Sequence, residues 1–510
     1  MERRYCGWMA TLMSGITLAC RLLSGPTAAN TNTASDWGHF SVGFGELDLN
    51  LSGNRGEARP LHLIVACFAT AVLLYVGLSG FAQAADWGGY KVGHAIVSVA
   101  GHKGSVNEDR PLDVMIWYPA DPKSYKDAPP STYRSRLKGV PLPGPWAALS
   151  WEFAAERARD NPTIKTRGRS YPLIVVSHPA GGDPFNSSKI NERLASYGYI
   201  VAAPFHNGDT QDDLRTDYIN DPKRGGTGVL SCLDGLLGTC TDVLRKSMQD
   251  RALDVSAVID NIPFFFREHV DMDRIGFVGL SRGAASGLGV AGGSTELSGW
   301  GILPDPRVRA LLLLTAGGRA NPMMNHAAIT IPTVQVSGTK DRNLSASRTS
   351  FVAINSASKA YVEVTGAWHR GLSADSYCEQ MQAVGPIAQS DPAAILDLHS
   401  LRNQLLSAIL PGETLSSGTT LDHCPYEFFV EPVDIRPIVL AQTGVQVTPE
   451  NVPTSIEMAL VSVIRSDLAR AFFGDVLDVR GDDSFGEYLL GEFQEKYGEN
   501  LIAVELQGFR

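Results

Sequence analysis

Residues 279–283, Gly-Leu-Ser-Arg-Gly, contain the strongest candidate nucleophile of the chain, Ser281. A short apolar run at 275–278 precedes them, and a stretch of small residues that can open a helix follows. A strand, a sharp turn and a helix in this order form a nucleophile elbow, in which two glycines let the strand and the helix pass closely. The five residues alone also fit an ordinary glycine-rich turn, since Gly accounts for 51 of the 510 residues. The flanking strand and helix therefore carry the prediction.

Serine becomes a useful nucleophile only when a base takes its proton and a third group orients the base. In sheets with an elbow, the acid and then the histidine follow the serine along the chain. The strand-like run 333–337 ends in a loop with Asp341, and residues 361–364 end in a small-residue loop with His369. We expect Asp341 to orient His369, and His369 to act as the base. The competing interpretations are a turn aspartate that caps its own loop and an ordinary polar histidine.

Acyl transfer also needs backbone N–H groups that bind the oxyanion of the tetrahedral intermediate. The amide of Arg282, directly after the nucleophile, is one expected donor. The other should come from the loop His-Pro-Ala-Gly-Gly that follows the run 173–177. Because Pro179 has no N–H, Ala180 is the first candidate and Gly181 the second.

Side chains that contact the substrate are harder to predict than the nucleophile. His178 lies beside the site in sequence; we expect it to shape the oxyanion loop by hydrogen bonding and count it among the substrate-contact candidates. Trp368, next to the predicted base, and the aromatic residues 264–266 offer apolar walls. Aromatic runs more often belong to a core than to a pocket, so this second interpretation stays open.

Apolar runs alternate with helical patterns along residues 91–364, which predicts an α/β fold with a mainly parallel sheet flanked by helices. The strands are expected at Lys91–Val99, 112–118, 173–177, 199–203, 275–278, Val308–Leu314, 333–337 and 361–364, and the helices at 190–196 and 243–266, with a helical patch at 151–159. Such sheets bind ligands outside the carboxyl ends of their strands. The loops with candidate chemistry all follow strand ends, so we expect them to meet at one edge.

The composition describes an ordinary globular protein, with 44% hydrophobic and 19% charged residues. A length of 510 residues fits one elaborated domain or two to three smaller ones. The net charge of −10 provides no basic surface for a phosphate backbone, so nucleic acid is not an expected partner.

Seven cysteines are present, and none forms a Cys-x-x-Cys pair, so neither a metal site nor a thioredoxin-like motif is indicated. Four of them lie in the body of the chain: Cys232, Cys240, Cys378 and Cys424. In an exported protein they would form two disulfides, Cys232–Cys240 and Cys378–Cys424. Four reduced, buried thiols are the alternative. The expected chemistry needs no cofactor.

The N-terminal region contains a pattern typical of an export signal. Arg55 and Arg59 precede the almost unbroken apolar run 61–81, and Ala-Gln-Ala at 82–84 is a typical cleavage site. We expect cleavage after Ala84 and a periplasmic or secreted enzyme. The run is long enough to span a bilayer, so an uncleaved membrane anchor is the alternative. Residues 1–84 would thus be an extension with a signal or anchor, and residues 85–510 the catalytic domain.

Several stretches together resemble a known family. They are YPLIVVSHPAGGDPFNSSKINERLASYGYIVAAPFHNGD at 171–209, the elbow IGFVGLSRGAA, the acid loop SGTKD and the base loop GAWHRG. They are similar to α/β-hydrolases of the dienelactone-hydrolase-like group, and within it to platelet-activating-factor acetylhydrolase-like serine esterases. The resemblance covers residues 87 to about 371 and resumes at 469–490, which is similar to the closing helix of the family.

This resemblance implies an α/β-hydrolase fold and an acyl-enzyme mechanism. It implies the triad Ser281, Asp341 and His369, with oxyanion donors at Ala180 and Arg282. Two residues depart from the family pattern: Ala284 replaces a common glycine after the elbow, and Pro179 replaces another in the oxyanion loop. We therefore expect a tighter acyl pocket.

About a hundred residues separate the predicted base from the closing helix. Long excursions in compact domains are usually lids or binding loops, so we expect a cap at 372–467 and a closing helix and tail at 468–510. A surface insertion without function is the alternative. The expected substrate is a small-molecule or polymeric ester or a β-diketone polymer, with transient membrane or lipid contact. A non-catalytic binding module on the same scaffold is the competing function.

Overall fold

The computed structural model describes residues 87–134, 152–166, 170–210, 237–318, 320–341, 343–373, 446–450, 455–477 and 484–509, and the single residues 436 and 440. The chain divides into two compact units, Met1–Phe81 and Ala82–Arg510, and every described residue lies in the second. The predicted signal at 61–84, most of the predicted cap, and Cys232, Cys378 and Cys424 lie outside the described residues. The backbone of Cys240 lies in a described helix, but its side chain is outside the described part of the structure.

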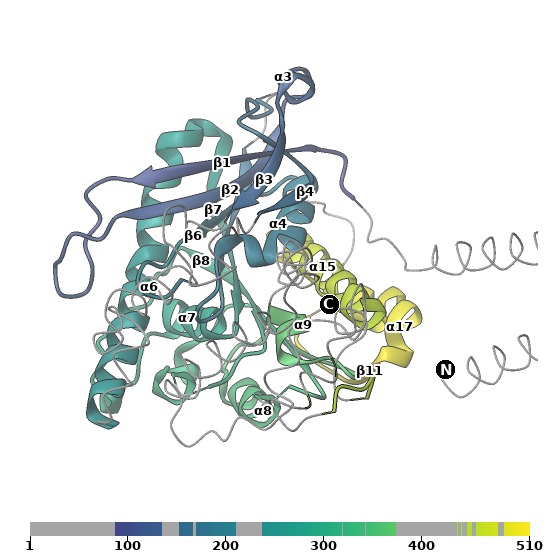
Figure 1. The fold of residues 1–510 in the computed structure, drawn as a ribbon. Helices are drawn as coiled ribbons and strands as arrows, with labels where there is room; N and C mark the ends of the chain where they lie inside the picture. Colours follow the sequence, from purple (N-terminus) through teal and green to yellow (C-terminus); the bar gives the residue numbers. More distant parts are fainter. Residues whose placement is uncertain are drawn as a thin grey trace, which may run out of the picture. The chain divides into compact units, whose positions relative to one another are not determined.

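The described part of the second unit is built on one sheet of eleven strands (Figure 1), in the order β11-β10-β9-β8-β7-β5-β6-β2-β1-β4-β3. The strands are β1 (Lys91–Val99), β2 (Leu112–Ala120), β3 (Pro130–Arg134), β4 (Glu152–Asp160), β5 (Tyr171–Ser177), β6 (Ile200–Pro204), β7 (Val270–Leu280), β8 (Val308–Leu314), β9 (Thr333–Gly338), β10 (Lys359–Val364) and β11 (Leu501–Gln507). The neighbouring strands β6, β5, β7, β8, β9 and β10 pair in parallel. Strand β2 pairs antiparallel with β6 on one side of this group, and β11 pairs antiparallel with β10 on the other. The predicted fold class is therefore confirmed.

Helices cover both faces of the sheet. In Figure 1, α6 (Leu237–Phe266) and α7 (Arg282–Gly292) lie on one side, and α4 (Ser188–Ser196) and α15 (Ser455–Val476) on the other. Burial on both faces explains why the central strands are continuous apolar runs. Within β5, Ile174 and Val176 join the core under α4 and α15, whereas Leu173 and Val175 join the core under α6 and α7.

The register of the parallel strands brings their carboxyl ends to one edge. Ser177 of β5 lies opposite Gly279 of β7, and Leu314 at the end of β8 lies opposite Val336 of β9. Strand β10 continues the row, because its last residue, Val364, pairs with the last residue of β9. The loops that contain the predicted nucleophile, acid and base therefore all leave the sheet on the same side.

One predicted element is wrong: where a helical patch was predicted at 151–159, residues Glu152–Asp160 form strand β4. Alanine, glutamate and arginine favour a helix locally, but a distant side chain decides the outcome. Glu192 of α4 is buried, and its carboxylate accepts hydrogen bonds from the N–H groups of Glu156, Arg157 and Ala158 at 3.1, 2.6 and 2.9 Å. An extended segment can offer these N–H groups to Glu192, whereas a helix would use most of them internally.

The C-terminal segment also differs from expectation. The predicted closing helix at 469–490 consists of α15, which begins earlier, at Ser455, and of the separate helix α16 (Phe485–Leu490). Helix α17 (Glu492–Tyr497) follows, and then β11, which pairs antiparallel with β10 at the sheet edge. Two of the largest core side chains, Phe472 and Phe473, come from α15. Among the described residues, no helix is both long enough and apolar enough to cross a membrane.

Candidate active site

Ser281 sits on a strained turn between β7 and α7. Its backbone has φ +56° and ψ −112°, a region that residues other than glycine rarely occupy. Hydrogen bonds hold it there: its N–H donates to the carbonyl of Leu314 at 2.9 Å, and its own carbonyl accepts from Ala284 N–H at 2.9 Å. The two glycines of the motif are sterically required, because a Cβ atom at Gly279 would lie 2.4 Å from the carbonyl oxygen of Gly283.

The structure brings Ser281, His369 and Asp341 together. His369 Nε2 lies 2.9 Å from Ser281 Oγ, and His369 Nδ1 lies 2.9 Å from Asp341 Oδ1. Both His369 and Asp341 are buried. Because a carboxylate can only accept, Nδ1 carries the imidazole proton, and Nε2 is left to accept the proton of the serine hydroxyl.

Contacts between the acid loop and the base loop fix this geometry. Gly338 lies against the base loop, since a Cβ atom there would come within 2.0 Å of the Ala367 carbonyl oxygen. The N–H of Lys340 donates to the same carbonyl at 3.1 Å. Asp341 Oδ1 also accepts from the N–H of Asn343 at 2.8 Å, so the aspartate caps its own loop as well as contacting His369. The carboxylate is therefore held from two sides.

The predicted oxyanion loop lies directly beside the elbow. Arg282 is the first residue of α7, so its N–H has no acceptor within the helix. The N–H of Gly181 donates to the carbonyl of Asp209 at 3.1 Å, whereas the N–H of Ala180 has no partner within the described part of the chain. The structure therefore favours Ala180 over Gly181 as the free donor.

Comparison with known proteins finds a family match over part of the chain and a structural neighbour. Residues 148–224 match the sequence profile of the family "Platelet-activating factor acetylhydrolase, isoform II". The match includes the oxyanion loop and ends before the elbow, and over this segment the resemblance seen in the sequence is confirmed. The sheet order and the strand-turn-helix elbow are those of an α/β-hydrolase fold. A solved structure, a ferulic acid esterase from Streptomyces cinnamoneus, is 18% identical with a TM-score of 0.44, over 81% of this chain and 95% of that chain. No curated protein matches the sequence.

His178 is part of the scaffold of the predicted oxyanion loop. It is 1% exposed, and its ring Nδ1 lies 2.8 Å from the carbonyl oxygen of Pro179 while Nε2 accepts from the N–H of His206 at 3.3 Å. Burial and the nearby Arg251 guanidinium hold the pKa of His178 well below its ordinary value. A neutral ring with both nitrogens occupied shapes the loop and leaves no ring nitrogen for a substrate.

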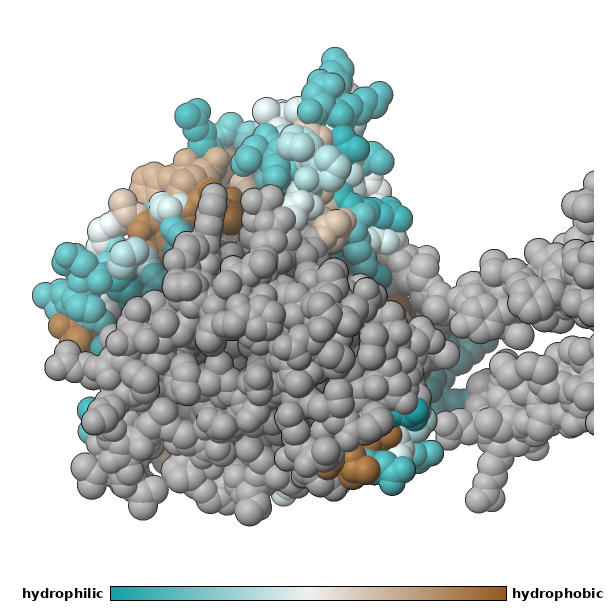
Figure 2. Space-filling model, viewed as in Figure 1, coloured by the Kyte–Doolittle hydropathy of each residue, from teal (hydrophilic) through white to brown (hydrophobic). Residues whose placement is uncertain are grey.

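The two predicted apolar walls differ in position. Trp368 precedes the base and is half-buried, with Lys340 Nζ 4.8 Å from its ring centroid. Residues 264–266 end α6 shortly before β7 begins, which places them at the edge of the sheet opposite the elbow, where Phe266 packs on Tyr118. Phe264 is 78% exposed. Figure 2 shows exposed apolar side chains at several separate places on this face, so an exposed apolar side chain does not by itself identify a substrate site.

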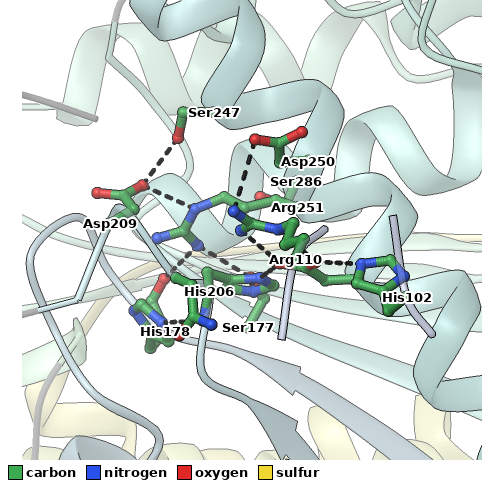
Figure 3. Close-up of polar contacts among 12 residues, drawn as sticks. His102, Arg110, Ser177, His178, His206, Asp209, Ser247, Asp250, Arg251 and Ser286 are labelled. Carbon is green, nitrogen blue, oxygen red and sulfur yellow. Dashed lines mark hydrogen bonds and ion pairs between the residues drawn. The ribbon is translucent and has the colours of Figure 1, made fainter. Parts of the chain in front are cut away.

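A buried charged cluster behind the oxyanion loop was not predicted (Figure 3). Its centre, Asp254 of α6, is fully buried and accepts from His102 Nε2, Arg110 Nε and His206 Nδ1, each at 2.8 Å. Burial opposes ionisation of Asp254, but these hydrogen bonds outweigh it and hold its pKa well below the ordinary value. The available signal was the placement of charged residues at 250, 251 and 254 within an apolar helical pattern.

His206 joins this cluster to the end of β5. Its Nδ1–H donates to Asp254, and its Nε2 lies 2.9 Å from Ser177 Oγ. Burial and the charge of Arg251 lower the pKa of His206 to about 4, so the ring is neutral near pH 7. Among the described residues, no group of three or more His, Cys, Asp and Glu side chains is arranged to hold a metal ion.

Proposed function

We propose that the hydrolase cleaves carboxylic esters through a covalent acyl-enzyme, with Ser281 as the nucleophile, His369 as general base and acid, and Asp341 as the group that orients His369. One observation carries the proposal: a single imidazole lies 2.9 Å from both the serine oxygen and the carboxylate oxygen. This is the geometry in which proton transfer from serine to histidine accompanies attack on a carbonyl.

The reaction would follow from these positions. Ser281 Oγ attacks the ester carbonyl while His369 Nε2 takes its proton, and the N–H groups of Ala180 and Arg282 bind the oxyanion. His369 then returns the proton to the leaving alcohol. Water, deprotonated by the same nitrogen, attacks the acyl-enzyme and releases the acid.

The backbone strain at the site supports an enzyme over a non-catalytic binding module. Ser281, the residue that follows β7, combines φ +56° with ψ −112°, which lies outside even the left-handed region. Such conformations cost on the order of 1–3 kcal/mol each and persist mainly where function needs them. A binding module on this scaffold would not require a strained serine that points its hydroxyl at a histidine.

The tighter acyl pocket predicted from the sequence would give the enzyme a preference for esters with short acyl chains. Ala284, where a glycine was expected, is fully buried behind the elbow, and Pro179 stiffens the oxyanion loop. We therefore include short-chain and acetyl esters as the first substrates to test, with longer acyl chains, polyesters and β-diketone polymers as the comparison set.

Labelling with a fluorophosphonate tests the proposal, because the reagent phosphonylates only an activated serine. The wild-type enzyme should be labelled and should hydrolyse 4-nitrophenyl acetate, and Ser281→Ala should lose both properties. Ser286→Ala, the same change one turn along α7, is the matched control and should keep both. Labelling that persists in Ser281→Ala would contradict the assignment of the nucleophile.

Export and two disulfides complete the proposal. They rest on the sequence alone, namely on the apolar run 61–81, the cleavage site that ends at Ala84 and the even number of cysteines in the body of the chain. An exported esterase would act in the periplasm or outside the cell, where an oxidising environment permits disulfides.

A further inference from the structure

The oxyanion loop is held from behind by one guanidinium. Arg251 of α6 is fully buried and donates from Nη1 to the carbonyl of His178 at 2.8 Å and from Nη2 to the carbonyl of Pro179 at 3.3 Å. Its Nη1 also lies 3.2 Å from Ser177 Oγ (Figure 3). Arg251 thus contacts three consecutive residues at the end of β5.

The direction of the Pro179 carbonyl determines the direction of the Ala180 N–H. In a planar trans peptide, the C=O of one residue and the N–H of the next point in opposite directions. The Pro179 carbonyl accepts from Arg251, from the His178 ring and from the N–H of Gly182. The N–H of Ala180 must therefore point away from this buried cluster, and three donors prevent the peptide from turning over.

Asp209 connects this loop to the elbow. Its carboxylate accepts from Arg251 Nε at 2.8 Å and from Ser247 Oγ at 3.0 Å, and Arg282 Nη1 lies 2.8 and 2.9 Å from its two oxygens. Its backbone carbonyl accepts from the N–H of Gly181 at 3.1 Å. Asp209 therefore binds Arg251, which holds the peptide that carries the Ala180 N–H. It also binds Gly181, the neighbour of Ala180, and the side chain of Arg282, whose N–H is the second proposed donor.

Electrostatic attraction keeps Asp209 ionised at this position. Burial opposes ionisation of Asp209, but Arg251 and Arg282 outweigh it, so its pKa is held far below the ordinary value. The wider cluster adds Arg110, Asp250 and Asp254, so three guanidinium groups stand against three carboxylates. The contribution of Asp209 and Arg251 is therefore the position of the two N–H donors rather than a net charge.

We propose that Asp209 and Arg251 are positioning residues that fix the N–H groups of Ala180 and Arg282 for oxyanion binding. This inference rests on the proposed esterase function. It differs from a purely structural role for the cluster because it predicts a defect confined to the transition state and its analogues, with substrate binding and the fold retained.

The test compares Asp209→Asn, Arg251→Lys and Arg282→Met with the wild-type enzyme in the hydrolysis of 4-nitrophenyl acetate, per active site titrated with a fluorophosphonate. Phenylboronic acid, which forms a tetrahedral adduct with a serine, serves as the transition-state analogue. Each variant should lower kcat by about 10- to 100-fold, with KM changed by less than about threefold. The inhibition constant of phenylboronic acid should rise by a similar factor.

Arg110→Met is the matched control. Arg110 is a buried arginine of the same cluster whose guanidinium donates to both carboxylate oxygens of Asp254. It should lower the melting temperature while kcat and the inhibition constant stay within about twofold of wild type. A loss in Arg110→Met as large as in Asp209→Asn would show general destabilisation of the cluster and overturn the proposal.

The outcomes separate the two proposals. If Asp209→Asn does not fold, Arg282→Met decides, because that side chain is 16% exposed and can be shortened without opening the core, while its backbone N–H remains. Wild-type values of kcat and of the inhibition constant in Arg282→Met would then overturn the positioning role alone. Absence of Ser281-dependent turnover in the wild-type enzyme would overturn both proposals.

Discussion

Gly283 faces the carbonyl oxygen of Ser177 so closely that a Cβ atom at Gly283 would lie 1.9 Å from that oxygen. Ser177 ends β5, and Gly283 lies in the first turn of α7. The contact therefore sets the distance between the loop that contains Ala180 and the elbow that contains Ser281.

Gly283→Ala should separate these two segments. The added methyl group has no space, and overpacking of this kind costs roughly 3 kcal/mol of the free energy of unfolding. We expect a lower urea midpoint and, in the folded fraction, a kcat reduced by about 10-fold or more, because the oxyanion donor and nucleophile move apart.

Gly474→Ala is the control for this change. Gly474 also lies in a helix, α15, but a Cβ atom there would meet nothing within 4 Å. This variant should be as stable as wild type or more stable by about 0.5–1 kcal/mol, with unchanged kcat. Equal stability of Gly283→Ala and Gly474→Ala would contradict the steric argument.

Asp341→Asn should reduce kcat by about 10⁴-fold, because an amide at this position no longer favours the Nδ1–H tautomer of His369. Circular dichroism should remain that of the wild type. Asp305→Asn is a suitable comparison, since Asp305 is also buried but precedes β8, at the opposite edge of the sheet. That variant should retain kcat. Neutral behaviour of Asp341→Asn would mean that another carboxylate orients His369.

Acid should destabilise the fold through its buried neutral histidines. Burial lowers the pKa of His206 from 6.5 to about 4, so the unfolded chain binds more protons than the folded one between these values. The free energy of unfolding should thus fall as the pH drops from about 6.5 to 4, by about 3 kcal/mol for His206 alone. His178, whose pKa is also lowered, acts in the same direction.

Urea unfolding at a series of pH values measures this effect as a slope. His206→Gln should have a lower free energy of unfolding than the wild type at pH 7. Between pH 6.5 and 4 its unfolding should take up about one proton fewer than that of the wild type, so its free energy of unfolding should depend less on pH. Asp209 and Asp254, whose pKa values are held below 3.8, contribute stability that is lost only at lower pH. An unchanged slope in His206→Gln would show that His206 is not the titrating group.

The exported enzyme should begin at or near Ala85 if the proposed signal is cleaved. Mass spectrometry of protein from the periplasm or culture medium gives the N-terminus directly. Residues 1–59 on the exported protein would contradict the cleavage. Recovery of the whole chain with the membrane fraction would instead favour the anchor at 61–81.

The proposed disulfide Cys378–Cys424 closes a loop of about 45 residues, for which the entropic estimate is roughly 4 kcal/mol of stabilisation. Reduction should lower turnover before far-UV circular dichroism changes, because the bridge would begin near His369. Peptide mapping of natively exported protein without reductant is the measurement. Recovery of Cys378 and Cys424 as alkylatable thiols would exclude the bridge.

The amino-acid sequence by itself determined the strands β1, β2 and β5 to β10 and the identity of the three residues that meet at the elbow, whereas β3, β4 and β11 were not predicted as strands. Buried parallel strands need uninterrupted apolar runs, and those runs are visible locally. A nucleophile that needs glycines on both sides, and an acid and a base directly after strand ends, leave equally local signals. Ser281, Asp341 and His369 could therefore be named before their distances were known.

Only the tertiary structure decided the features that depend on distant partners. A helical patch was predicted at 151–159, but contacts with Glu192 hold Glu152–Asp160 as strand β4. The helix α15, which places Phe472 and Phe473 in the core, starts at Ser455, earlier than predicted. The N–H of Gly181 donates to the carbonyl of Asp209, so of these two N–H groups only that of Ala180 is left for an oxyanion within the described part of the chain. Buried charges must find partners wherever the fold brings them together, and no periodicity within one segment records a contact between Asp209, Arg251 and Arg282.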